Sequence, residues 1–120
     1  MLIELYKLTK IGAFLEFAKR GLEYYIREFV EKDIYWGDTL DADTIDKEAG
    51  HAVLRALINM YEVTKDERYL RLAERAAYFT TTWMMFWDIP FNRKTPLGKL
   101  KYSTFGGTTV SVENQHMDIY

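Results

Sequence analysis

The sequence contains no cysteine, only 2 prolines and almost no excess of either charge. Without cysteine there is neither a disulfide framework nor thiol chemistry, as is usual in a reducing compartment. A net charge of -2 gives no general attraction to nucleic acid. No apolar run approaches the roughly 20 residues that cross a bilayer, and Glu4 and Lys7 interrupt any signal-type core at the N-terminus. We therefore expect a soluble cytoplasmic protein that binds neither nucleic acid nor a membrane.

Aromatic residues, by contrast, are abundant. They make up 16% of the chain, as 7 Phe, 9 Tyr and 3 Trp. Such an excess can serve a large core, an interface, or a surface that stacks on ligands. A chain of 120 residues has room for one domain with a modest core, so we treat residues 1–120 as a single domain.

The clearest pattern covers residues 46–87, where apolar residues recur at helical spacing on both sides of a short polar turn, 64–67. The two apolar rows are Ala49, Val53, Ala56, Leu57 and Met60, and then Tyr69, Ala73, Ala76, Thr80, Trp83 and Trp87. Asp66 is a plausible N-cap of the second helix. Because the connection is so short, the two helices must be antiparallel, which gives a helical hairpin.

The flanking segments complete an all-α prediction. Residues 2–30 are predicted to form one long helix, or two with a bend, because apolar residues recur every three or four positions. Residues 31–44 are predicted to form a loop, with Asp43 or Thr44 capping the next helix and Glu48 in its first turn. Residues 91–109 are predicted to form a long connection. The expected fold is a single helical-hairpin domain.

Acidic and aromatic residues gather before the hairpin. They are Tyr35, Trp36, Asp38, Asp41, Asp43 and Asp46. Capping and turn formation explain such acids in the simplest way. Carboxylates also bind sugar hydroxyls and aromatic faces stack on sugar C–H surfaces, so the composition is also typical of a carbohydrate cleft.

A second polar cluster lies near the C-terminus and comprises Glu113, Asn114, Gln115, His116 and Asp118. It fits either a ligand-contacting loop or the start of a helix. Glu113 and His116 have a spacing seen in some metal sites, but two ligands do not make a site, so we expect no metal and no cofactor. A nucleophile triad from Ser111, His116 and Asp118 is disfavoured because no Gly-x-Ser-x-Gly elbow is present.

Several segments together resemble those of six-hairpin glycosidase-type proteins. They are residues 46–50, 64–70, 73–77, 83–91 and 106–118, the last with its Asn-Gln-His-x-Asp run. The resemblance implies an (α/α)6 toroid whose loops at one end form a sugar cleft. Such a toroid takes about six hairpins, and this chain has room for two at most. It is therefore either a piece of a longer protein, the alternative we favour, or a stand-alone small helical bundle.

The resemblance implies a segment of a carbohydrate-active enzyme, with glycoside hydrolase activity if the toroid is complete. Glycosidases commonly place two carboxyl groups across the scissile bond. The catalytic candidates are Asp46, Glu48 and Glu113; the substrate-binding candidates are Trp36, Asp41, Asp43, Asn114 and His116. Trp36 would stack on the sugar, Asp41 and Asp43 would bind hydroxyls, and Asn114 and His116 would orient it. The simpler role for Glu48 is that of a favourable charge in the first turn of a helix, and the simpler role for Glu113 is that of a helix cap.

A non-enzymatic helical interaction or oligomerisation module is the alternative function. Residues 83–87 (Trp-Met-Met-Phe-Trp) are its best candidate patch, unless they belong to the domain's own core. Three helices cannot cover all of the apolar surface predicted here, and a large exposed apolar patch favours association. We therefore expect the isolated chain to be catalytically silent and to form a homo-oligomer.

Overall fold

A computed structural model describes residues 1–39, 42–112 and 117–118. Most of the described chain is helical, which confirms the all-α expectation at that level, while the toroid stays a prediction. The helices are α1 (Leu2–Thr9), α2 (Gly12–Tyr25), the π-helix η1 (Ile26–Val30), α3 (Lys47–Thr64), α4 (Glu67–Thr81) and α5 (Pro96–Lys99). The strands are β1 (Trp36–Thr39), β2 (Ala42–Ile45), β3 (Thr108–Thr109) and β4 (Met117–Asp118).

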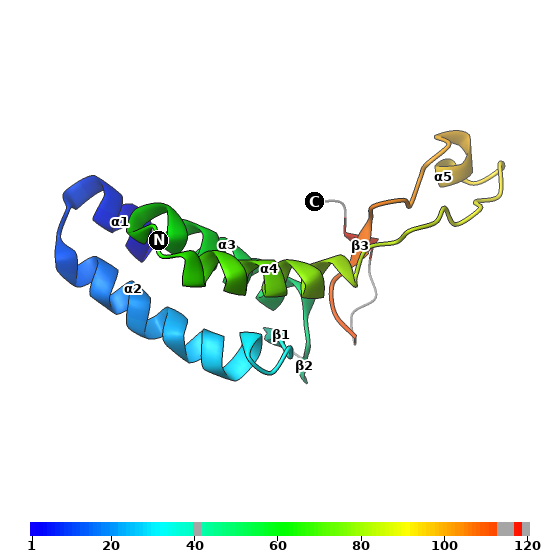
Figure 1. The fold of residues 1–120 in the computed structure, drawn as a ribbon. Coiled ribbons are helices and arrows are strands. Elements are labelled where there is room, and N and C mark those ends of the chain that lie inside the picture. Colours follow the sequence, from blue (N-terminus) through cyan, green and yellow to red (C-terminus); the bar gives the residue numbers. More distant parts are fainter. Residues whose placement is uncertain (40–41, 113–116, 119–120) are drawn as a thin grey trace.

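The N-terminal segment forms two helices with a bend, the second of the two predicted alternatives. Lys10 adopts a left-handed conformation with φ 59° and its N–H donates to the Tyr6 carbonyl at 2.8 Å, which ends α1. Helix α2 starts at Gly12 and continues into η1. Figure 1 shows that the chain reverses direction at the bend, so that α2 runs back beside α3 and α4 at an angle to them.

The antiparallel hairpin of α3 and α4 is confirmed. Lys65 closes α3 in a left-handed conformation, and the Asp66 carboxylate accepts from the Arg68 N–H at 2.9 Å as the predicted N-cap. Helix α4 ends at Thr81, six residues before Trp87, so its predicted length was wrong. The hydroxyls of Thr80, Thr81 and Thr82 donate to carbonyls three residues earlier, the kind of local bond that competes with a continuing helix.

A β-hairpin replaces much of the loop predicted before α3. Strands β1 and β2 pair antiparallel with Trp36 opposite Ile45 and Gly37 opposite Thr44. The predicted caps at Asp43 and Thr44 were therefore wrong, because pairing keeps the chain extended through Ile45. The N-cap of α3 is Asp46 instead, and Glu48 lies in the first turn as predicted.

The core lies between the α3–α4 hairpin and the end of α2. Its fully buried side chains include Ile26, Val30, Tyr35, Leu57 and Met60. The Tyr35 and Phe79 rings stack with centroids 4.2 Å apart. A Cβ at Gly50 would lie 2.6 Å from the Phe79 ring, so α3 and α4 approach as closely as they do only because position 50 has no side chain.

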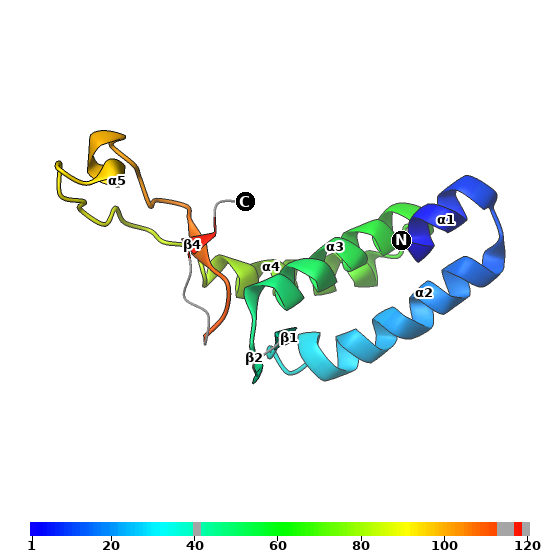
Figure 2. The ribbon, with the colours of Figure 1, turned by 180° about the vertical axis from the view of Figure 1, so that it is seen from behind.

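Beyond α4 the chain forms an arm that carries α5 away from the helices, as both views show (Figures 1 and 2). At the base of the arm, the Asp88 carboxylate joins the outgoing and returning segments of the chain. It accepts hydrogen bonds from the Ser103 hydroxyl at 2.6 Å and from the Thr104 N–H at 2.9 Å. Within residues 83–87 no side chain is buried, and Phe86 and Trp87 are each 64% exposed, so this run does not build the core.

After the arm the chain returns to the start of α3. The Lys47 N–H donates to the Val110 carbonyl at 3.0 Å and the Val112 N–H donates to the Ile45 carbonyl at 3.2 Å. Strands β3 and β4 pair antiparallel, so Met117–Asp118 is a strand, where the sequence left a ligand-contacting loop or the start of a helix as alternatives. Among the described residues, no helix has the length and apolar character needed to cross a membrane.

Candidate functional site

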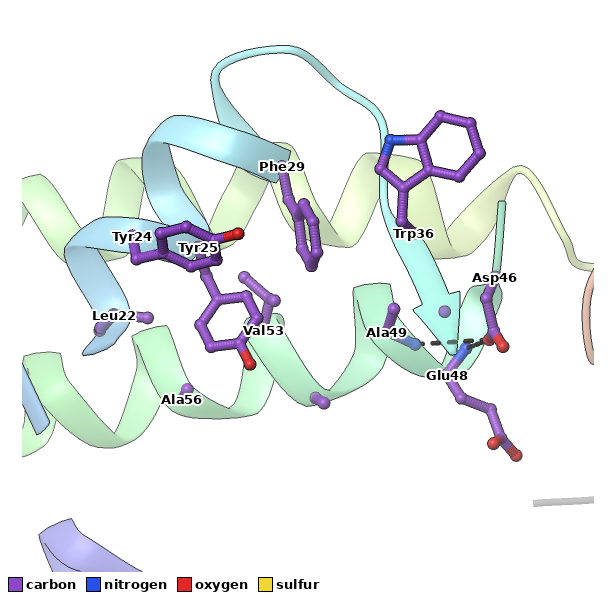
Figure 3. A pocket seen from close by; sticks show the side chains of 12 residues that line it. Leu22, Tyr24, Tyr25, Phe29, Trp36, Asp46, Glu48, Ala49, Val53 and Ala56 are labelled. Atoms are coloured by element: carbon purple, nitrogen blue, oxygen red, sulfur yellow. Dashed lines mark hydrogen bonds between the residues drawn. The ribbon is translucent and has the colours of Figure 1, made fainter. Parts of the chain in front are cut away.

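An open groove of about 620 Å³ separates α2 and α3. Leu22, Tyr25 and Phe29 line it from α2 and η1, and the opposite wall is formed by Ala49, Ala52, Val53 and Ala56 of α3. Figure 3 shows the rings of Tyr25 and Phe29 directed from their helices toward α3. Trp36, Gly37, Asp46 and Glu48 line the end of the groove where the β-hairpin meets α3.

The groove continues toward the N-terminus as a second hollow of about 850 Å³. The two hollows share Leu22, Tyr25, Ala52 and Ala56. The second is also lined by residues 1–4 at the start of α1, by Phe17, Ala18 and Gly21 of α2, and by Arg55 and Asn59 of α3. One side of α3 is therefore open along much of its length, and its open face is made largely of small side chains.

Trp36 is the aromatic residue at the polar end of the groove. Its side chain is 47% exposed, and Figure 3 shows the indole directed away from Asp46. The next residue, Gly37, lies against Asp46, since a Cβ there would come within 2.3 Å of the Asp46 carboxylate. The absence of a side chain at position 37 thus allows β1, which carries Trp36, to approach the start of α3 closely.

Asp46 serves as a structural cap at this end. The residue is 3% exposed, and its Oδ1 accepts from the N–H groups of Glu48 at 2.5 Å and Ala49 at 3.4 Å. These bonds satisfy backbone donors that the first turn of a helix leaves free. The geometry gives this catalytic candidate a role in starting α3, and leaves Glu48 as the carboxylate at this end with access to solvent.

Glu48 is exposed, and its carboxylate makes no hydrogen bond or ion pair with any residue that the structure describes. Figure 3 shows this carboxylate directed away from Trp36, on the other side of the β1 end. The indole and the carboxylate thus flank one groove end without converging on a common point.

The structure does not describe the side chains of the other five candidates. Asp41, Glu113, Asn114 and His116 lie outside the described residues, and Asp43 is placed by its backbone alone, in β2 opposite Asp38. Of the eight candidates, the structure therefore brings Trp36, Asp46 and Glu48 to one groove.

Sequence reasoning missed Tyr25 and Phe29 as groove residues because their helical spacing assigned them to a core face. The number of aromatic residues on α2 and η1, larger than one small core needs, was the signal that could have revealed them.

The buried hydroxyl of Tyr35 has no hydrogen-bond partner among the described residues. Burial raises the pKa of Tyr35 to about 12. On the other side of α3, the Lys47 ammonium donates to the Thr108 hydroxyl at 3.1 Å. Within the described chain, no group of three or more His, Asp or Glu side chains is arranged to hold a metal ion.

No protein-family model, curated protein or solved structure matches the chain.

Proposed function

We propose that the chain is a segment of a carbohydrate-active protein of the helical-hairpin type, with part of its sugar site at the end of the groove beside Trp36. One observation carries the proposal: an exposed indole and the Glu48 carboxylate, which has no partner among the residues that the structure describes, line the same open groove. Aromatic faces pack on the C–H surfaces of sugars, and ionised carboxylates accept strong hydrogen bonds from hydroxyls.

The proposed roles combine the two side chains that line the groove end, Trp36 and Glu48, with the candidates that the family resemblance implies. Trp36 stacks on the sugar ring and Glu48 is the acid, base or hydroxyl acceptor. Because Asp46 caps α3, the second carboxylate that glycoside hydrolysis requires is Glu113 in this proposal. Asp41 and Asp43 bind hydroxyls, and Asn114 and His116 orient the sugar.

Further helices must complete the site in this proposal. The groove lies open between α2 and α3, so a sugar at its end would be held from one side only. Catalysis requires the reacting groups to be held in a fixed geometry with water excluded. The isolated chain is therefore expected to bind sugar weakly and to turn over no glycoside.

Sugar binding is tested by NMR titration of the ¹⁵N-labelled chain with monosaccharides and oligosaccharides at tens of millimolar. We expect the Trp36 indole N–H and the Glu48 and Ala49 amide signals to shift. Trp36→Ala should abolish the shifts, while Trp87→Ala, which removes an exposed indole from the arm, should preserve them. If Trp36 does not respond to any sugar, or if Trp36→Ala leaves the other shifts intact, the proposed site is wrong.

Catalytic silence is tested with a panel of aryl glycosides. We expect no turnover by the isolated chain above that of buffer. Turnover that is lost in Glu48→Gln but kept in Glu74→Gln, a matched change on the exposed side of α4, would show that the chain needs no further helices.

A non-enzymatic self-association module is the second candidate. The exposed apolar side chains favour it, since Phe17 is 57%, Phe86 64% and Phe105 66% exposed. Self-association without any sugar response at Trp36 would select this candidate over the first.

A further inference from the structure

We propose that two copies of this chain associate across the open groove, with the two α3 helices antiparallel and crossing at Ala52. This proposal names the surface through which the chain would self-associate, the second candidate function above. It does not depend on sugar binding. Three observations carry it: the surface area of the chain, the shape of the groove and the charges on its rim.

The chain exposes more surface than a compact monomer of its size. Its accessible area is 8462 Å², and a compact monomer of 14.2 kDa exposes about 6,800 Å². The radius of gyration is 17.5 Å, against about 13.6 Å for a compact chain of this length. Part of the excess of roughly 1,700 Å² lies on the projecting arm (Figures 1 and 2), and the total is about twice the ~800 Å² that each partner buries in a stable interface of standard size.

The groove carries both halves of a self-complementary surface. On α2, the rings of Phe17 and Tyr25 are 57% and 44% exposed along the groove. On α3, Ala52 and Ala56 present a low surface that a second helix can approach closely. In a two-fold contact the rings of one copy pack on the partner's α3, and the partner's rings pack reciprocally.

Charge selects the antiparallel orientation. Glu48 and Arg55 both line the rim of the groove on α3, and neither forms an ion pair with any residue that the structure describes. Their midpoint falls between positions 51 and 52, so each lies about 5 Å along the helix from a two-fold axis placed there. In the antiparallel pair, Glu48 therefore meets the partner's Arg55 and Arg55 meets the partner's Glu48. A parallel pair would place like charges at the same level, which costs affinity.

The bundle that results has α3 and the partner's α3 at its centre, with α2 and its copy on opposite sides. Each α3 is then covered on both faces, by its own α4 and by the partner. The arm takes no part in this contact, and the β-hairpin borders it at Trp36 and Gly37.

Sedimentation velocity on the full chain over a range of concentrations tests the proposal. We expect a reversible species of about twice 14.2 kDa. Arg55→Glu places two like charges at each end of the contact and should weaken dimerisation at least about ten-fold. Ala52→Glu should do the same by placing charge at the axis. The double variant Glu48→Arg/Arg55→Glu restores opposite charges and should recover dimerisation relative to Arg55→Glu.

The control is Arg71→Glu, the same change on the exposed face of α4, which should leave dimerisation unchanged. Circular dichroism on each variant separates lost association from lost folding, and Arg55→Gln replaces Arg55→Glu if the latter unfolds. Wild-type chain that is monomeric at high micromolar concentration overturns the proposal. So does a dimer that survives Ala52→Glu and Arg55→Glu, which would place the interface elsewhere, and so does failure of the double variant to recover.

Discussion

Helix α3 has two sides that differ sharply in how well the chain covers them. Toward α4, Leu57 and Met60 are fully buried and Gly50 contacts the Phe79 ring. Toward α2, Ala52 and Arg55 are exposed along an open groove. The difference indicates that the α3–α4 hairpin is the part of this fold that the chain stabilises by itself, whereas the α2 side has unused apolar surface for another partner.

The largest effect should come from the closed side. Leu57→Ala removes a fully buried side chain and should lower the free energy of unfolding by about 2–5 kcal/mol. The neighbouring Ile58 is 40% exposed, so Ile58→Ala should cost about 1 kcal/mol or less. Urea unfolding followed by circular dichroism measures both. Equal costs at the two positions would show that α3 is not packed as described.

Two glycines give the next contrast. Gly50→Ala introduces a Cβ at 2.6 Å from the Phe79 ring and should cost about 1–3 kcal/mol. Gly21 lies in the interior of α2 with no atom within 4 Å of the same added group, so Gly21→Ala should stabilise by up to about 1 kcal/mol. Thermal or urea unfolding checks the opposite signs. A stabilising Gly50→Ala would contradict the close approach of α3 and α4.

The hairpin was predictable because its pattern is local. The periodicity of residues 46–64 and the Asp66 cap signal lie within a few residues of the structures they specify. The β-hairpin was not predicted, because Asp and Gly in residues 37–43 favour turns over strands. Its own pairing is local, with Trp36 opposite Ile45, but the hydrogen bond from the Val112 N–H to the Ile45 carbonyl comes from a segment far along the chain. The threonine run that ends α4 was a local signal, and the apolar periodicity through Trp87 masked it.

The candidate site was predictable only in part. Trp36 and Glu48 were chosen by residue type, and the structure places both at one groove end. The roles of Gly37 and Asp46 depend on how closely β1 approaches α3, and the groove depends on how α2 lies against α3. Neither of these contacts between distant segments leaves a periodic signal in the sequence.

The buried Tyr35 hydroxyl gives a pH-dependent test of the closed side. Its pKa is raised to about 12, chiefly by burial, so the folded state holds this proton more tightly than the unfolded state does. The associated stability is complete below about pH 10 and is lost as the pH rises toward 12. Tyr35→Phe should be neutral or slightly stabilising at pH 7 and should reduce the alkaline loss. An unchanged alkaline profile in urea titrations of the variant would show that Tyr35 is not buried.

The smallest effect should come from the ion pair that ties α2 to α4. Arg68 donates to both carboxylate oxygens of Glu23, at 2.5 and 2.9 Å, and lowers the pKa of that carboxyl. Both side chains are more than 40% exposed, so Arg68→Gln should cost less than about 1 kcal/mol. Because the folded pKa of Glu23 is lowered, this contribution is present at neutral pH and is lost on acidification. Urea unfolding at pH 7 and pH 3 should show a smaller difference between variant and wild type at pH 3.

The open side of α3 is tested most directly by a single cysteine. The chain has none of its own, so Ala52→Cys places one thiol beside the proposed two-fold axis. Under mild oxidation we expect a disulfide-linked dimer to form readily at micromolar concentration, while Arg71→Cys, on the exposed face of α4, cross-links slowly or not at all. Non-reducing electrophoresis over time measures both rates. An Ala52→Cys chain that stays monomeric, or cross-links no faster than Arg71→Cys, would contradict the pairing of α3 with its copy.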